Sequence, residues 1–119
     1  MAKVIRSVNQ QTQEQSWNHK KQNPSFRDKN TEKVWKRVFV KKWSRELQKR
    51  SWEEMALLFS FEDDLKKLKE IFGTDLEQLK GKRKGQHSVK VNDQWRICFV
   101  WEKGKVYQLE LVDYHGEKK

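Results

Sequence analysis

The spacing of apolar residues changes once along this chain, at Gly73, and this change restricts the fold more than any other feature of the sequence. Before Gly73, apolar residues recur every three or four positions, as they do on one face of an α-helix. After it, they alternate with polar residues, as they do in strands that bury one side. The sequence therefore predicts an α+β fold, with helices packed on one face of a small antiparallel sheet.

Local signals give the expected limits of these elements. Residues Asn30 to Glu32 offer capping chemistry for a short first helix. Ser44 is the expected cap of a longer helix that ends near residue 60, and Gly73 is the expected end of a third. Phe26 is expected at the end of a short edge strand. The other strands are expected over residues 87–91, 95–101 and 106–115.

The chain is long enough for one domain, and its N-terminal part differs from the rest. A chain of 119 residues can bury one core but not two. Residues 1–23 are polar, rich in Gln and Asn, and without periodicity, so they are predicted to form a flexible extension. Residues 24–119 are predicted to form the single domain, in which Trp and Phe supply large apolar side chains.

The charge of the chain points to a polyanionic partner. Lys and Arg number 27 against 17 Asp and Glu, a net charge of +10 that favours nucleic acid, the ribosome or an acidic protein. No segment approaches the ~20 apolar residues of a membrane span, and a signal-peptide pattern is missing, so we expect a cytoplasmic protein without membrane contact. The single cysteine, Cys98, and the three histidines lack ligand-like spacing, so neither a metal nor a cofactor is expected.

Alternation assigns the strand residues to a core face and a cationic face. The core face is expected to hold Val89, Val91, Trp95, Ile97, Phe99, Trp101, Tyr107, Leu109 and Leu111. Lys90, Arg96 and Tyr114 are then expected to emerge on the opposite face, bordered by the loop of residues 80–84. Cations beside an aromatic ring suit RNA, because the cations meet phosphates and the ring can stack on an unpaired base.

A face of this kind could cleave RNA without a metal. The 2′-hydroxyl must lose a proton, the charge of the phosphorane must be stabilised, and the 5′-oxygen must gain a proton. Structural roles explain the same residues: Arg96 could pair with Glu110 across the strands, Tyr114 could pack at a strand end, and residues 80–84 could form a solvated turn.

The segment LEQLKGKRKGQHSVKVNDQWRICFVWEKGKVYQLELVDYH, residues 76–115, contains several short motifs in order. They are Leu-Lys-Gly at 79–81, Arg83 with Gly85, Ser-Val-Lys-Val at 88–91, Asn-Asp-Gln-Trp-Arg-Ile at 92–97 and Asp-Tyr-His at 113–115. In this combination the segment resembles the C-terminal half of the HigB-type toxins, or plasmid maintenance killer proteins, of the RelE/ParE superfamily. Residues 25–35 and the helical segment that follows resemble the first half of the family more loosely.

The resemblance implies a RelE-like microbial RNase fold and a toxin of a type II toxin–antitoxin system that cuts mRNA in the ribosomal A site without a metal. It implies three partners: a helix-turn-helix antitoxin of the HigA type, the 70S ribosome with its mRNA, and operator DNA reached only through the antitoxin. The residues that it places around the scissile phosphate are Lys80, Arg96, Tyr114 and His115. Contacts to the RNA backbone are expected from Lys82, Arg83, Lys84 and Lys90.

One position departs from the pattern and leaves the general base open. Some relatives carry a histidine three residues before the lysine, where this chain has Glu77. A carboxylate can accept a proton, but it also repels phosphate or pairs with a cation of the loop. His87 shares the parity of the valines, so it is expected to pack rather than replace the missing histidine. Two other functions fit the sequence: a non-catalytic inhibitor that binds DNA gyrase, as ParE toxins do, and a basic RNA- or ribosome-binding module.

Overall fold

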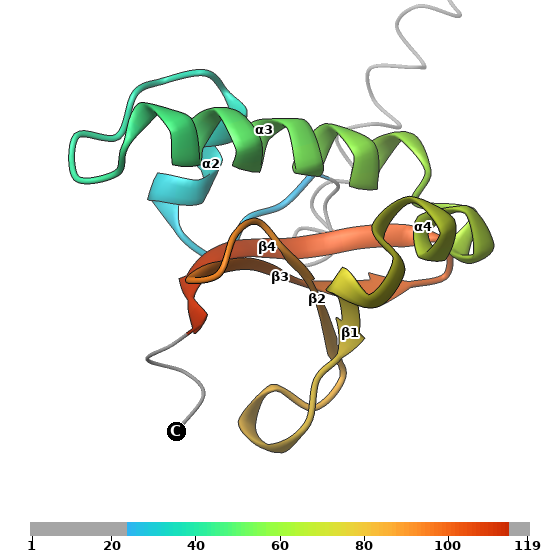
Figure 1. Cartoon of the computed structure of the whole chain (residues 1–119). Helices are drawn as coiled ribbons and strands as arrows, with labels where there is room; N and C mark the ends of the chain where they lie inside the picture. The colour runs from blue at the N-terminus through green and yellow to red at the C-terminus, as the bar shows by residue number, and fades with distance from the viewer. Residues whose placement is uncertain (1–23, 115–119) are drawn as a thin grey trace, which may run out of the picture.

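The structure, a computed structural model, describes residues 24–114, in which helices lie over one face of a sheet (Figure 1). The elements are α2 (Lys29–Trp35), α3 (Arg45–Ser60), α4 (Leu65–Phe72), β1 (Leu76–Gln78), β2 (Gln86–Lys90), β3 (Trp95–Glu102) and β4 (Lys105–Asp113). The strands lie in the order β1-β2-β3-β4, and each is antiparallel to the next. The predicted α+β fold, with helices on one face of a small antiparallel sheet, is confirmed.

The sheet has one strand more than the alternation predicts. β1 pairs with β2, and Leu76 lies opposite Val89. Three residues are too few to show a period of two, which is why β1 was not expected. Phe26 forms a single isolated bridge with Leu109 of β4, where a short edge strand was expected.

The helices begin and end at capping residues. Ser44 Oγ accepts the amide of Leu47 at 3.1 Å, and Gly73 ends α4 with a φ of 58°, both as predicted. The cap of α2 is Asp28, two residues before the predicted capping segment; its carboxylate accepts both the amide and the hydroxyl of Thr31. The Thr31 hydroxyl oxygen also accepts the amide of Leu111 at 2.9 Å, so the cap fastens α2 to β4.

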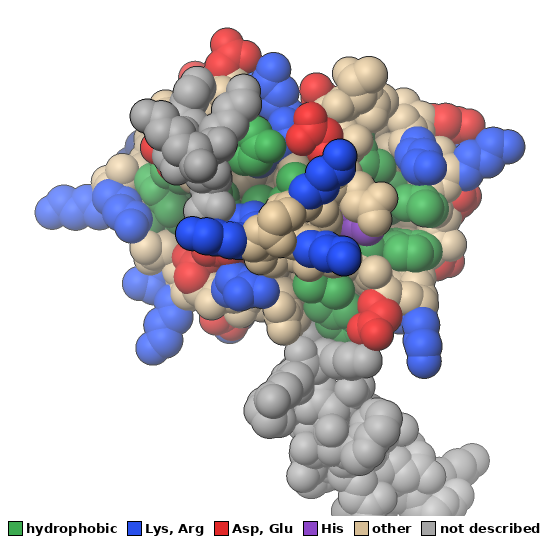
Figure 2. Space-filling view, turned by 90° about the horizontal axis from the view of Figure 1, so that it is seen from below, with side chains coloured by type: hydrophobic (Ala, Val, Ile, Leu, Met, Phe, Trp, Pro, Cys, Tyr) green, Lys and Arg blue, Asp and Glu red, His purple; other side chains and the backbone are tan. Residues whose placement is uncertain are grey.

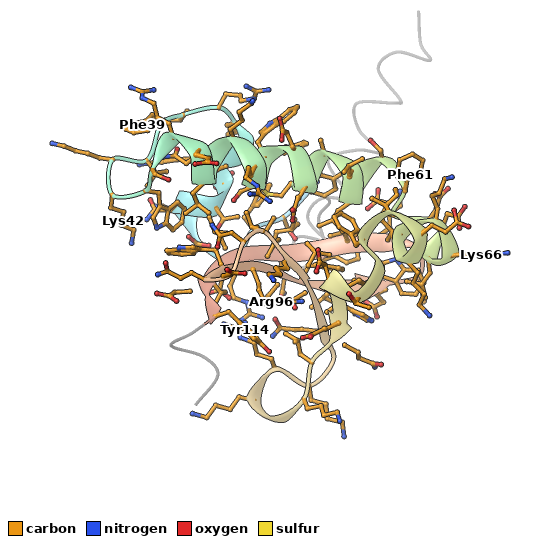
Figure 3. All side chains as sticks on the ribbon, viewed as in Figure 1. Phe39, Lys42, Phe61, Lys66, Arg96 and Tyr114 are labelled. Carbon is orange, nitrogen blue, oxygen red and sulfur yellow. The ribbon has the colours of Figure 1, made fainter. Side chains whose placement is uncertain are left out.

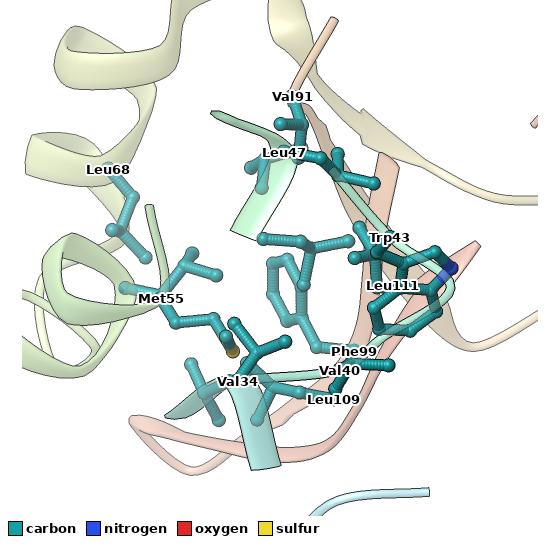
Figure 4. Close-up of a cluster of buried hydrophobic side chains, with 14 residues drawn as sticks. Val34, Val40, Trp43, Leu47, Met55, Leu68, Val91, Phe99, Leu109 and Leu111 are labelled. Carbon is teal, nitrogen blue, oxygen red and sulfur yellow. The ribbon is translucent and has the colours of Figure 1, made fainter. Parts of the chain in front are cut away.

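One apolar core fills the space between the helices and the sheet (Figure 4). α3 contributes Met55 and Leu58, and α4 contributes Leu68, all fully buried. They meet the predicted core face of the sheet, where Ile97 and Phe99 are also buried. The core therefore fixes which face of the sheet is left for a site.

A bulge in β4 moves Tyr107 from its predicted position. The register between β3 and β4 shifts between Cys98 and Val100, and Gln108 has a φ of 54°. Because an extra residue reverses the alternation, Val106 takes the core position that was expected for Tyr107. The prediction that Tyr107 shares a face with Leu109 was therefore wrong.

Candidate active site

The face of the sheet opposite the helices carries a small apolar cluster and a buried arginine. Leu79, Cys98 and Val112 form the cluster. Arg96 lies on the same face as Cys98, because the two residues are two positions apart on β3. Arg96 is 6% exposed, so it lies on the predicted face but does not emerge into solvent as expected.

Four groups hold the Arg96 guanidinium in place. Nε donates to Ser88 Oγ at 2.7 Å, and Nη2 donates to the carbonyl oxygen of Asp75 at 2.6 Å. Nη2 also lies 3.6 Å from Glu77 Oε1. The guanidinium carbon lies 5.0 Å from the centre of the Tyr114 ring, and Figure 3 shows the two side chains together below the sheet. Among the described residues Nη1 has no hydrogen-bond partner, so it remains available to a ligand.

The acidic partner of Arg96 is not the one expected if the arginine had only a structural role. Glu110, its suggested cross-strand partner, pairs instead with Arg83 at 3.2 Å. Arg83 also donates to Gln86 Oε1 at 3.1 Å. The side chain of Arg83, a residue predicted to contact RNA, is therefore bonded to residues of β2 and β4. Glu77 pairs with Arg96 rather than with a cation of the loop. The carboxylate that departs from the family pattern thus lies at the arginine itself.

A loop rich in lysine borders this face. It joins β1 to β2 through the turn η3 (Gly81–Arg83), and Gly81 and Gly85 have φ values of 65° and 93°, which favour glycine. Lys80, Lys82 and Lys84 are exposed, and none forms an ion pair with a carboxylate in residues 24–114. Figure 2 shows Lys and Arg side chains gathered on this face of the molecule. Lys80 and Lys84 also line a hollow of about 430 Å³ at the base of the loop.

The structure brings some of the predicted residues together and leaves others apart. Arg96, Tyr114 and Glu77 are in contact, and Lys90 lies opposite Arg96 on β2. Lys90 pairs with Asp93 at 3.2 Å, and its side chain is 40% exposed. His115 lies outside the described residues.

His87 packs on the core side, as its parity predicted. Its ring stacks on Phe99 with 5.8 Å between ring centres. Burial lowers the pKa of His87 below its ordinary value, and the positive charge of Lys69 lowers it further. His87 is therefore a neutral packing residue and not a replacement for the histidine missing at Glu77.

Three groups around Arg96 were missed by sequence reasoning. Ser88 shares the parity of Arg96, so the alternation contained a signal for it. Asp75 acts through its backbone carbonyl, which no sequence motif reveals. The third, Glu54 of α3, lines a polar hollow with Asp75 and Lys90.

Glu54 is a half-buried carboxyl group with an unusual protonation equilibrium. Its Oε1 is buried without a hydrogen-bond partner among the described residues. The pKa of Glu54 is raised to about 7, chiefly by burial; the charge of Asp75 adds to this rise, whereas Arg50 and Arg96 oppose it. At neutral pH this group is therefore close to half protonated.

Replacing Glu54 by glutamine is expected to stabilise the protein at pH 8 and to change little at pH 4. The raised pKa means that ionisation of Glu54 above pH 4.5 favours the unfolded chain, so its stability penalty grows as the pH rises toward 7. We expect Glu54→Gln to raise the free energy of unfolding at pH 8 by roughly 2 kcal/mol, once partial solvent exposure is allowed for. Urea denaturation at both pH values measures this. Glu53→Gln, at an exposed neighbour paired with Lys49, is the matched control, and an equal gain at both pH values would contradict the assignment.

Comparison with known proteins identifies the family. A family model described as the RelE-like toxin HigB of type II toxin–antitoxin systems matches residues 24–115. No curated protein matches the chain. None of the described helices is both long and apolar enough to cross a membrane. The match covers most of the chain and includes the Arg96 face, the lysine loop and the helices above the sheet, so the chain belongs to the HigB-like toxin family.

Proposed function

We propose that this HigB-like toxin is a ribosome-dependent endoribonuclease that cuts mRNA without a metal and thereby stops translation. The observation that carries the proposal is the Arg96 guanidinium, which is oriented by Ser88 and Asp75, lies against the Tyr114 ring and keeps Nη1 available. A fixed guanidinium can stabilise the charge that develops on a phosphate without reorganising during the reaction.

The proposed reaction is an attack by the RNA on its own backbone. The 2′-oxygen loses its proton and bonds to phosphorus, the bond from phosphorus to the 5′-oxygen breaks, and the leaving oxygen gains a proton. The products are a 2′,3′-cyclic phosphate and a free 5′-hydroxyl. Arg96 and Lys80 hold the phosphate and stabilise the pentavalent state, and Lys82, Arg83, Lys84 and Lys90 contact the RNA backbone.

Tyr114 and Glu77 determine how the phosphate reaches Arg96. The Tyr114 ring lies against the Arg96 guanidinium, and the Glu77 carboxylate lies beside Nη2 of the same group. A phosphate can accept a hydrogen bond from Nη1. The Tyr114 ring would then orient the sugar or stack on a base. Glu77 is close enough to the same arginine to be a candidate proton acceptor, and His115 is proposed to assist proton transfer near the C-terminus.

The proposed partners follow from the family and the charge. Membership of a type II system implies an antitoxin. We propose that it is a helix-turn-helix protein of the HigA type, that the toxin reaches operator DNA only through it, and that both act in the cytoplasm. The exposed lysines of the loop that borders the Arg96 face favour the 70S ribosome and its mRNA as the target.

Mapping mRNA 5′ ends by primer extension in a translating bacterial extract tests the proposal. We expect cuts at in-frame codons when ribosomes are present and an intact message in the matched ribosome-free reaction. An intact message in both reactions, with protein shown to be folded by circular dichroism, would overturn the proposal. A gyrase supercoiling assay with the same protein would then test the inhibitor alternative.

A further inference from the structure

Glu54 of α3 is a titratable group that the proposed cleavage reaction does not use. It lines a polar hollow of about 410 Å³ between α3, the turn η2 (Gly73–Asp75) and the segment that follows β2. Glu54 Oε1 is buried and has no hydrogen-bond partner among the described residues, although burial of a polar atom without a partner costs free energy. The residues that line the hollow are Arg50, Glu54, Asp75, Lys90, Val91, Asn92 and Asp93.

Two residues of this hollow connect it to Arg96. The backbone carbonyl oxygen of Asp75 accepts a hydrogen bond from Arg96 Nη2 at 2.6 Å, and Asp75 also lines the hollow. Lys90, which lines the hollow as well, lies opposite Arg96 on the neighbouring strand β2. The hollow therefore adjoins the arginine of the candidate active site, on the side where the Asp75 carbonyl holds it.

The net charge of the hollow changes with the ionisation of Glu54. The other charged side chains that line it are two cations, Arg50 and Lys90, and two carboxylates, Asp75 and Asp93, so their charges cancel. The hollow is therefore neutral when Glu54 is protonated and carries one negative charge when Glu54 is ionised. Because the pKa of Glu54 is about 7, both states are populated at neutral pH.

The charges that act on Glu54 come from its own helix and from two other elements. Glu53 of α3 and Asp75 of η2 favour the protonated form, whereas Arg50 of α3 and Arg96 of β3 favour the ionised form. A phosphate bound to Arg96 would offset one of the two cations that favour ionisation. Glu54 would then hold its proton more strongly.

We propose that Glu54 is a positioning residue that acts through Arg96, so that RNA phosphate binds most tightly when Glu54 is protonated. An ionised Glu54 places a second negative charge near the phosphate and weakens its binding. Protonation removes this repulsion. The two equilibria are linked, so a phosphate that prefers the protonated form must also draw a proton onto Glu54. This inference rests on the proposed function, which assigns the phosphate to Arg96.

Exposure distinguishes Glu54 from the other carboxylate near Arg96. The Glu77 carboxylate lies 3.6 Å from Nη2, and its side chain is 48% exposed, so it can turn toward water when a phosphate arrives. Glu54 belongs to a helix, and its Oε1 is covered by protein, so its charge is screened less by water. Protonation is therefore the means by which Glu54 loses its effect on the phosphate.

The first test measures the affinity of the full chain for a short 2′-O-methyl RNA, which lacks the hydroxyl group needed for cleavage. Fluorescence anisotropy at pH 6 and pH 9, at constant ionic strength, compares the wild type with Glu54→Gln. We expect Glu54→Gln to bind like the wild type at pH 6 and about 10-fold more tightly at pH 9. The histidines are common to both proteins, so their titration does not affect this comparison.

The matched control is Glu53→Gln, which removes the same charge from an exposed neighbour on α3. Its affinity relative to the wild type should be the same at both pH values, because the Glu53 carboxylate pairs with Lys49 at the surface and is screened by water. Glu54→Gln is expected to fold, since it removes the stability penalty described above. Circular dichroism of each variant checks this.

The NMR signal of the Arg96 Nε nitrogen tests the same link without RNA. Nε is fixed by its hydrogen bond to Ser88 Oγ, so its chemical shift reports a change of charge nearby. In the wild type we expect this signal to titrate with a midpoint near the Glu54 pKa of about 7. In Glu54→Gln this step should be missing.

Four results would overturn the inference. They are an Arg96 signal that does not titrate near pH 7 in the wild type, equal affinities of the wild type and folded Glu54→Gln at pH 9, a gain of the same size and pH dependence in Glu53→Gln, and no RNA binding by the wild type at pH 6. Primer extension tests the proposed function separately. A chain that cuts mRNA but shows no link to Glu54 keeps its function and loses this inference, whereas a chain that shows the link and leaves mRNA intact binds RNA at Arg96 without cleaving it.

Discussion

Replacing Arg96 by alanine is expected to lower the rate of ribosome-dependent mRNA cleavage by ~10²–10³-fold, the usual effect of removing one preorganised donor from a charged transition state. The guanidinium is oriented by Ser88 and the Asp75 carbonyl before any substrate arrives, so its loss removes stabilisation that solvent cannot quickly replace. Single-turnover cleavage of mRNA on programmed ribosomes measures the effect, because it separates the chemical step from binding.

The controls separate this loss of chemistry from a loss of folding. Arg96→Ala leaves the buried Ser88 hydroxyl and Asp75 carbonyl without their donor, which costs about 1–3 kcal/mol of stability. Ser88→Ala removes one of the same hydrogen bonds but keeps the charge, so it should lose comparable stability and far less activity. Wild-type cleavage rates in folded Arg96→Ala would show that the phosphate is held elsewhere.

Replacing Gln48 by leucine is expected to lower the free energy of unfolding by about 3 kcal/mol, because three buried backbone groups lose their partner together. The side-chain oxygen of Gln48 accepts the backbone N–H of Val40, and its side-chain nitrogen donates to the backbone carbonyls of Val40 and Trp43. All three donor–acceptor distances are 2.9 Å or less. Gln48 itself is 8% exposed, so water cannot replace these bonds without opening the segment between α2 and α3. Urea denaturation at constant pH measures the loss.

Two further substitutions test the same explanation. Gln48→Glu retains the acceptor for Val40 but places a charge against two carbonyl oxygens, so it should destabilise at least as much as leucine at pH 8 and less at low pH, where the carboxyl is protonated. Lys49→Leu changes an exposed neighbour and should have little effect. A Gln48→Leu protein as stable as the wild type would mean that the segment is held by packing alone.

The sequence was sufficient for the fold class and for the face on which the site lies. Alternation through β3 is uninterrupted on either side of Arg96, so Arg96 and the core residue Ile97 were assigned to opposite faces correctly. The beginning of α3 at Ser44 and the end of α4 at Gly73 were also predicted correctly, because each depends on one residue and its near neighbours in the sequence.

The features that the sequence did not reveal depend on contacts between distant segments. The bulge that displaces Tyr107 arises where β4 must fit β3, and nothing near Gln108 marks it. The burial of Arg96 depends on the Asp75 carbonyl, 21 residues away in sequence. The raised pKa of Glu54 likewise requires α3 to pack beside the segment that contains Asp75. Periodicity reports the orientation of a residue within its own element and not the groups that approach it from another.

The position of β4 in the chain sets the order in which a newly made molecule can assemble. β4 supplies the bridge to Phe26, the amide bonded to Thr31 and the Val112 side chain of the cluster on the Arg96 face. The helices are therefore synthesised well before the strand that completes their packing surface. A nascent chain cannot complete either face of the sheet until residue 112 has left the exit tunnel, so the protein acquires its core and its Arg96 surface together.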